Sequence, residues 1–150
     1  MRVYLVIMDE TDEAHLALRF AARRAARTGG QVHLLALVPR QPFVAFGGIQ
    51  ATIEEEARAR AEALVTAAAG SLMSEAGVAP SIAVRQGEGV GVIRDYLAEH
   101  PEVSALVLGA AASGGPGPIV SHFSAIAGQV PCPVYLIPGS MSEADLERLS

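Results

Sequence analysis

Residues 3–13 read VYLVIMDETDE, which is six apolar side chains in a row followed by four acids and one threonine. A continuous apolar run of this length is typical of a β-strand that is buried on both faces of a parallel sheet. The polar cluster predicts the start of a helix, because Thr11 or Asp12 can cap it and acids favour its positive end. The opening of the chain therefore predicts a buried strand that leads directly into a helix.

The same alternation of strand and helix continues along the chain. The first helix is expected to end at Gly29-Gly30. Further strands are expected at residues 32–38, 81–84, 103–108 and 134–137, and further helices at about residues 51–76, 90–100 and 119–129. Strands that alternate with helices form right-handed βαβ units. The predicted fold class is thus α/β and Rossmann-like, a three-layer open parallel five-stranded sheet with helices on both faces.

Composition and charge exclude several function classes. The net charge is -5, the chain has no Lys, and residues 95–147 contain no Arg either. An acidic chain without clustered cations argues against a nucleic-acid partner. No apolar stretch reaches the roughly 18 residues that span a bilayer, and the N-terminal run lacks a signal-peptide cleavage site. We therefore expect a cytoplasmic protein with no membrane partner.

The order and spacing of these segments resemble the universal stress protein family over nearly the whole chain. The resemblance rests on the strand that ends in Asp9, on VHLLALVP at residues 32–39, and on LVLG at 106–109 and PCPV at 131–134. It implies the adenine nucleotide alpha hydrolase-like version of the fold. We expect a universal stress protein domain at residues 1–139 and a C-terminal tail at 140–150, either polar or forming one marginal helical turn.

Members of this family that bind ATP carry a loop of the form Gly, two residues, Gly, nine residues, Gly, then Ser or Thr. Here Gly109 stands at the first position and Ser121 supplies the final hydroxyl, whereas Ala112 and Val120 replace the other two glycines. The spacing is also shorter by two residues. The resemblance therefore implies a degraded version of the ATP-binding loop.

Two further features of this loop weaken phosphate binding. It holds no Arg or Lys to offset phosphate charge, and Pro116 and Pro118 have no N–H to donate. Gly114, Gly115 and Gly117 remain as a smaller nest for an anion. The alternative interpretation is a tight Gly-Pro turn that leads into a helix with Pro118 at its first position.

By the same resemblance, Asp9 lies beside adenine and ribose, and the backbone of Val38 lies near adenine. The alternative role for Asp9 is a loop carboxylate or helix cap. The expected site for ATP or AMP, with Mg²⁺, consists of Asp9, Val38, Gly109, Gly114, Gly117 and Ser121. No catalytic residue is expected, since His122 has no placed acid or nucleophile. No metal site is expected either, because the chain has one Cys and no His-x-x-x-His or Cys-x-x-Cys spacing.

The resemblance implies a stress-response binding module that is not an enzyme, with weak or lost ATP or AMP binding and no certain cofactor. It also implies a homodimer through the last strand, whose apolar edge favours pairing. One alternative is an ATP-binding member with slow ATPase or phosphotransfer activity, which the lack of basic residues in the loop disfavours. Another is a protein partner that contacts the segment at residues 39–48 through Phe43 and Phe46.

Overall fold

The computed structural model describes residues 1–40 and 47–150 of the chain. The described elements, in chain order, are β1 (Val3–Met8), α1 (Asp12–Thr28), β2 (Gln31–Val38), α2 (Gly47–Ala76), β3 (Ser81–Gln86), α3 (Gly89–Glu99), β4 (Ala105–Ala110), α4 (Pro118–Ala125), a 3-10 turn at Ala127–Gln129, β5 (Val134–Pro138) and α5 (Glu143–Leu149). The predicted alternation of strands and helices is confirmed. The predicted last helix is divided into α4 and the separate turn that follows it.

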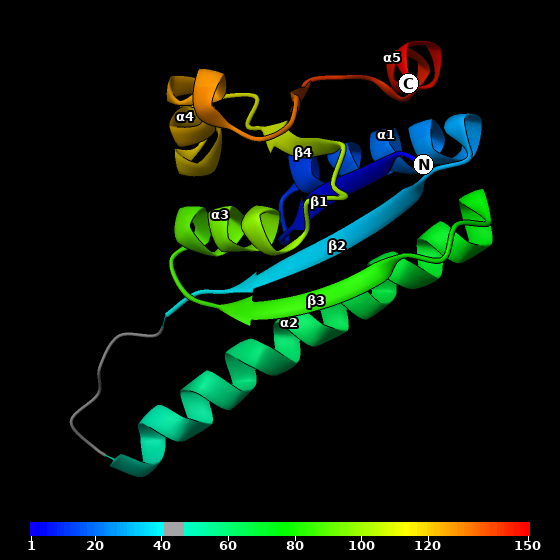
Figure 1. Cartoon of the computed structure of the whole chain (residues 1–150). Helices are drawn as coiled ribbons and strands as arrows, with labels where there is room; N and C mark the ends of the chain where they lie inside the picture. Colours follow the sequence, from blue (N-terminus) through cyan, green and yellow to red (C-terminus); the bar gives the residue numbers. More distant parts are fainter. Residues whose placement is uncertain (41–46) are drawn as a thin grey trace.

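The five strands form one parallel sheet in the order β3-β2-β1-β4-β5. The chain builds outward from β1 through β2 to β3, then returns to the other side of β1 for β4 and β5 (Figure 1). The strand order therefore reverses between β1 and β4. This confirms the open, parallel, Rossmann-like sheet that the sequence predicts.

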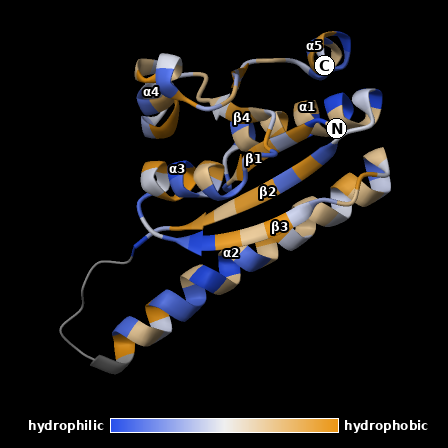
Figure 2. Cartoon of the chain, viewed as in Figure 1, coloured by the Kyte–Doolittle hydropathy of each residue, from blue (hydrophilic) through white to orange (hydrophobic). Residues whose placement is uncertain are grey.

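Two hydrophobic clusters cover the two faces of this sheet. On one face the sheet packs against α1 and α2, and on the other it packs against α3 and α4. Successive side chains of β1 alternate between them, so that Val6 belongs to the first cluster and Leu5 and Ile7 to the second. Every residue of β1 is buried, which is why this strand is apolar throughout (Figure 2).

Helix α1 begins and ends where local chemistry predicts. The Thr11 side chain accepts a hydrogen bond from the Ala14 N–H at 3.2 Å and so caps the first turn. Gly29 ends the helix in the left-handed conformation, with φ 65°. A residue with a β-carbon is strained at that angle, so the glycine is the natural stop.

Helix α2 is longer than the strands it covers. Its 30 residues span about 45 Å, roughly twice the length of β3. Its buried side chains run only from Ala57 to Leu72, and Figure 1 shows its first turns passing the ends of β2 and β3. Gly70 lies within this unbroken helix. Phe43 and Phe46, the aromatic pair of the suggested protein contact, lie outside the described residues.

The C-terminal segment differs from the polar tail or marginal turn that the sequence predicts. It forms helix α5, which Ser142 caps by accepting a hydrogen bond from the Asp145 N–H at 3.1 Å. Leu146 is completely buried. Helix α5 contacts α1, where Arg19 pairs with Glu143. The segment is therefore packed onto the domain, because one apolar side chain and the arginines of α1 hold it.

Candidate functional site

The switch point of the sheet brings together the ends of β1 and β4. The register pairs Val6 with Val107, which places Met8 level with Gly109. Asp9 follows Met8 directly, so its backbone lies next to the end of β4. In open α/β sheets the crevice at such a reversal is where ligands bind. Asp9 and Gly109, far apart in the sequence, are therefore neighbours at the expected place.

Asp9 is exposed and takes part in the turn that starts α1. Its Oδ1 accepts hydrogen bonds from the Thr11 N–H at 2.9 Å and from the Thr11 hydroxyl. Thr11 is in turn the cap of α1. The turn therefore fixes the carboxylate in place at the switch point. Asp9 supports the helix start while remaining accessible from solvent.

Gly109 is required by the packing of α1 against β4. A β-carbon at this position would lie 2.2 Å from the carbonyl oxygen of Glu13 and 2.4 Å from its carbonyl carbon. Real β-carbons do not approach backbone atoms so closely. The first turn of α1 therefore lies directly over this strand, and a close approach of helix to sheet accounts for the glycine without a ligand.

The loop from β4 to α4 is lined by glycines in left-handed conformations. Gly114, Gly115 and Gly117 have φ of 75°, 85° and 98°, and no atom lies within 4 Å of a β-carbon built at any of them. The Ala111 N–H donates to the Pro116 carbonyl oxygen at 3.4 Å, which closes the loop on itself. Each of these glycines thus has open space on its β-carbon side, so no neighbouring side chain or backbone covers the loop there.

Helix α4 starts in the way that the alternative interpretation of this loop predicts. Pro118 stands in the first turn, and Gly117, the residue before it, supplies no side-chain cap. The Ser121 N–H donates to the Gly117 carbonyl oxygen at 3.0 Å, and its side chain is exposed. Val120, which replaces a family glycine, is buried in the core with α3 and the sheet. The Gly-Pro turn and the glycine nest are therefore parts of one loop.

Val38 lies on the other side of β1 from this loop. It is the last residue of β2 and its side chain is buried in the core with α1 and α2. Its carbonyl oxygen accepts a hydrogen bond from the Gly87 N–H at 3.2 Å. Only its backbone is thus placed at the edge of the sheet where the switch point lies.

Glu88, an acid that precedes α3 and lies near the start of α4, was not predicted from the sequence. Its carboxylate accepts hydrogen bonds from the Gly91 N–H at 2.9 Å and the Val90 N–H at 3.0 Å, and these bonds lower its pKa. A β-carbon on Gly89 would lie 3.4 Å from Ile119, so the starts of α3 and α4 touch. Glutamate is not among the preferred helix caps, so the sequence offered no clear signal for this role. Glu88 places a negative charge near the start of α4.

His122 lies in the last turn of α4. Its Nε2 is buried and has no partner among the described residues, and its ring packs edge-on against Phe123 at 5.4 Å. Neither an acid nor a nucleophile is bonded to it there. The His122 ring therefore has a packing role beside Phe123.

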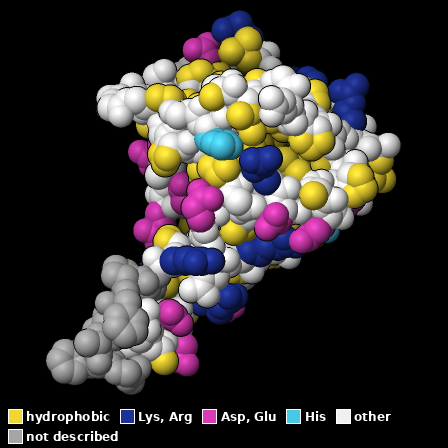
Figure 3. All heavy atoms as spheres, turned by 60° about the vertical axis from the view of Figure 1, so that its left-hand side comes forward, with side chains coloured by type: hydrophobic (Ala, Val, Ile, Leu, Met, Phe, Trp, Pro, Cys, Tyr) yellow, Lys and Arg dark blue, Asp and Glu magenta, His cyan; other side chains and the backbone are white. Residues whose placement is uncertain are grey.

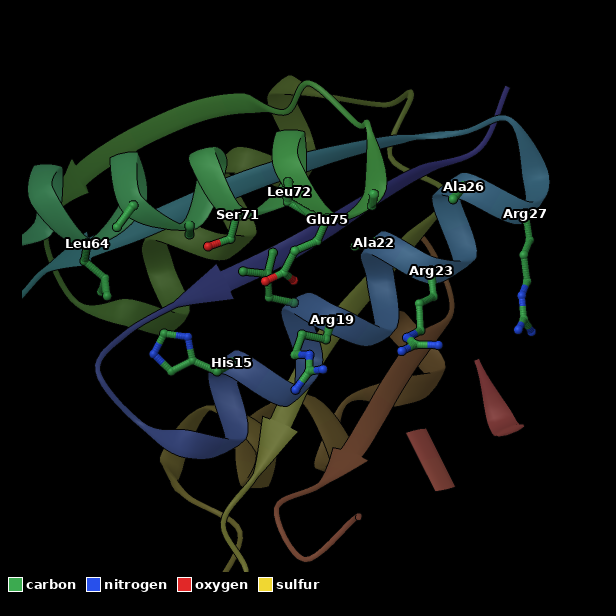
Figure 4. A pocket seen from close by; sticks show the side chains of 14 residues that line it. His15, Arg19, Ala22, Arg23, Ala26, Arg27, Leu64, Ser71, Leu72 and Glu75 are labelled. Carbon is green, nitrogen blue, oxygen red and sulfur yellow. The ribbon is translucent and has the colours of Figure 1, made fainter. Parts of the chain in front are cut away.

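A groove of about 710 Å³ lies between α1 and α2, away from the switch point (Figure 4). Leu18 and Leu72 are among the apolar residues that line it, and Arg19 and Arg23 point along its side from α1. Both arginines also pair with acids of α5. None of the six residues of the expected nucleotide site lines this groove. Its cations are thus partly neutralised by the chain itself.

Charges of both signs are mixed on the face of the molecule that Figure 3 presents. Figure 3 shows arginines interspersed with acidic side chains on the face that it presents. Such a surface lacks the continuous basic stripe by which proteins bind phosphate backbones. Separately, none of the helices within residues 1–40 and 47–150 has the length and apolar character needed to cross a membrane.

Comparisons with known proteins agree with this geometry. The model of the universal stress protein family matches residues 1–138. The structure of UspA from Lactobacillus plantarum is similar with a TM-score of 0.77 and 22% identity, covering 91% of this chain and 97% of that one. The Archaeoglobus fulgidus universal stress protein in complex with dAMP has a TM-score of 0.59 and 23% identity, covering 91% and 97%. A family protein from Arabidopsis thaliana with AMP bound has a TM-score of 0.62 and 16% identity, covering 92% of each chain. The search of curated proteins found no match.

Proposed function

Since the chain belongs to the universal stress protein family, we propose that it is a non-enzymatic stress-response module that binds AMP weakly and ATP more weakly still. The proposed site is the crevice where β1 and β4 end. The observation that carries the proposal is the loop after β4, whose three left-handed glycines face open space. Two similar structures, solved with dAMP and with AMP, support a nucleoside monophosphate as the ligand class.

Each part of the site has a role in this proposal. Asp9 and the backbone at Val38 bind the nucleoside, which lies across the ends of the strands. The N–H groups of Gly114 and Gly117 bind the phosphate, since bare backbone in left-handed turns points donors at an anion. The exposed hydroxyl of Ser121 adds one more donor. The site requires no side-chain cation for a single phosphate.

The same loop disfavours a triphosphate and its transfer. Residues 95–147 contain no Arg or Lys, so additional phosphate charge is not compensated from this part of the chain. The Glu88 carboxylate adds repulsion, since hydrogen bonds from α3 keep it ionised. Phosphoryl transfer depends on cations placed against the developing charge. We therefore propose binding without catalysis.

Isothermal titration of the nucleotide-free protein tests this proposal. We expect AMP to bind with a Kd on the order of 100 μM, which is about −5.5 kcal/mol. ATP is expected to bind less tightly, with or without Mg²⁺. Tighter binding of ATP than AMP, or ATP hydrolysis above the uncatalysed rate, would contradict the proposal. If neither nucleotide gives a saturable heat of binding up to millimolar concentration, the family's nucleotide site has been lost.

A matched pair of variants locates the binding. Ser121→Ala removes one donor and is expected to weaken AMP severalfold, by about 1 kcal/mol. Ala112→Gly restores a family glycine at an exposed position and is expected to strengthen binding. Restoring the other glycine at Val120 is unsuitable, because its side chain is part of the core and its loss would leave a cavity. An unchanged AMP affinity in both variants would place the ligand elsewhere.

We further propose a homodimer through β5. This strand is at one end of the sheet order, and Leu136 is 43% exposed on it. An uncovered edge presents unpaired backbone groups, which a second copy related by a two-fold axis can satisfy.

Sedimentation of a Leu136→Arg variant tests the dimer. We expect this change to give a monomer, because it places a charge in the middle of the proposed interface. The control is Ile82→Arg on β3, the opposite edge, where the side chain is 48% exposed. That variant is expected to remain a dimer. A monomeric parent protein, or dissociation by the Ile82 change alone, would exclude pairing through β5.

A further inference from the structure

Two histidines and a glutamate gather at the opposite end of the sheet from the switch point. Helix α3 runs antiparallel to β2, since Gly89 at its start lies near Leu37 and Tyr96 in its last turns bonds His33. His33 lies near the start of β2, and His100 directly follows α3. The cluster is therefore at the amino ends of the strands, apart from the crevice proposed for nucleotides.

The three side chains point toward one another. One ligand atom from each of His33, His100 and Glu102 lies within 4.8 Å of the others. The Nδ1 of His100 is 3.0 Å from the Oε1 of Glu102, and the two imidazole rings are perpendicular with centroids 5.8 Å apart. We propose that these three residues form a binding site for a divalent transition metal ion of the Zn²⁺ class.

The donor set and its spacing suit such an ion. Imidazole nitrogens favour Zn²⁺, Cu²⁺ and Ni²⁺ over Mg²⁺ and Ca²⁺, which prefer oxygen ligands. Ligands around tetrahedral zinc lie about 3.3 Å apart, and His100 and Glu102 are already near that separation. The contraction needed toward His33 falls on side chains that can move, since those of His100 and Glu102 are 31% and 50% exposed. Their exposure leaves a fourth position for water.

Neighbouring groups hold the ligands in place. The Nδ1 of His33 is hydrogen-bonded to the Tyr96 hydroxyl at 2.7 Å, and the Tyr96 ring stacks on His100 at 4.0 Å. The Val103 N–H donates to the His100 carbonyl oxygen at 3.1 Å and fixes the turn that carries Glu102. Supports of this kind orient the imidazoles of metal sites and fix their tautomers. The cluster is thus built on structured backbone rather than on a loop tip.

The surrounding charges permit a cation. Arg85 is a fixed cation on the far side of the Tyr96 contact, with its guanidinium 4.9 Å from the centre of the Tyr96 ring. That charge is paired with Glu99 at 2.7 Å. The carboxylate of Glu102 belongs to the cluster itself, and its negative charge attracts a metal ion.

Sequence spacing gives no sign of this site, which departs from the expectation that the chain has none. His33 is separated from the other two ligands by α2, β3 and α3. The pattern His100-x-Glu102 alone is common in proteins without metal. The three ligands come together only because α3 runs antiparallel to β2, which brings His100 and Glu102 next to His33.

Calorimetric titration of the untagged, full-length, chelator-treated protein with ZnCl₂ at neutral pH tests the proposal. We expect saturable binding of about one ion per chain, and visible absorption bands from tetrahedral Co²⁺ in a parallel titration. His100→Gln and Glu102→Gln are each expected to weaken Zn²⁺ binding roughly tenfold or more. Both positions are partly exposed, so circular dichroism should show an unchanged fold.

The control variants separate this site from others. His15→Gln removes an exposed histidine of α1 and is expected to leave Zn²⁺ affinity unchanged. Ser121→Ala, at the proposed nucleotide site, is expected to do the same. No saturable Zn²⁺ binding, or equal binding in the parent and both ligand variants, would overturn the proposal. No nucleotide is present in the titration, so its result is independent of the proposed nucleotide function.

Discussion

A Gly109→Ala variant is expected to lose about 3 kcal/mol of unfolding free energy, at the upper end of what overpacking a core costs. The added methyl group would lie 2.2 Å from the Glu13 carbonyl oxygen. Because that atom belongs to the backbone of α1, no side-chain rotation can remove the clash. The first turn of α1 would have to move away from β4 and take the Asp9 turn with it. Urea denaturation followed by circular dichroism measures the loss.

Two other glycines provide the controls. Gly70 lies inside α2 with no atom within 4 Å of a built β-carbon, so Gly70→Ala is expected to gain about 0.5–1 kcal/mol. Gly114→Ala also has open space but keeps a φ of 75°, and is expected to lose about 1–2 kcal/mol. A loss at Gly109 no larger than that at Gly114 would mean that α1 adapts easily. The close-approach explanation would then fail.

The parts of the fold that the sequence predicts well are those set by local chemistry. Strand β1 was located to the residue because burial on both faces leaves six apolar side chains without interruption. The ends of α1 were equally clear, since Thr11 caps one end and Gly29 takes the left-handed conformation at the other. Strand order was not predicted, because the right-handedness of βαβ crossovers does not by itself decide on which side of β1 each later strand is placed.

The candidate site was predictable only in its location. The resemblance to the family pointed to Asp9 and Gly109, which the structure places side by side at the switch point. It did not reveal that packing alone explains Gly109, or that Val120 is a core residue. Both findings depend on the elements that pack against these residues in the fold, namely α1 for Gly109 and the core with α3 for Val120. A single residue type carries no information about such contacts.

Helix α5 shows the same division between local and tertiary information. Its start was readable from Ser142 and Asp145, which have the spacing of a helix cap. Its docking was not, because the segment has few apolar residues and nothing in it distinguishes the buried Leu146 from the exposed Leu149. The structure shows ion pairs of Arg19 with Glu143 and of Arg23 with Glu147 at this contact. These groups are exposed, and exposed pairs contribute only about 0–1 kcal/mol each.

Leu146 should therefore decide whether α5 stays on the domain. Replacing a buried leucine with alanine typically lowers the free energy of unfolding by about 2–5 kcal/mol. We expect α5 to open locally, without unfolding of the sheet, because it packs at the end of the chain against α1. The loss is then limited to the free energy of docking, and amide exchange in α5 is expected to accelerate roughly 30-fold or more in Leu146→Ala. Leu149→Ala, one turn away at a side chain that is 49% exposed, is expected to change exchange little. Equal acceleration in both variants, or a larger effect of Arg19→Gln, would show that the ion pairs and not Leu146 hold the helix.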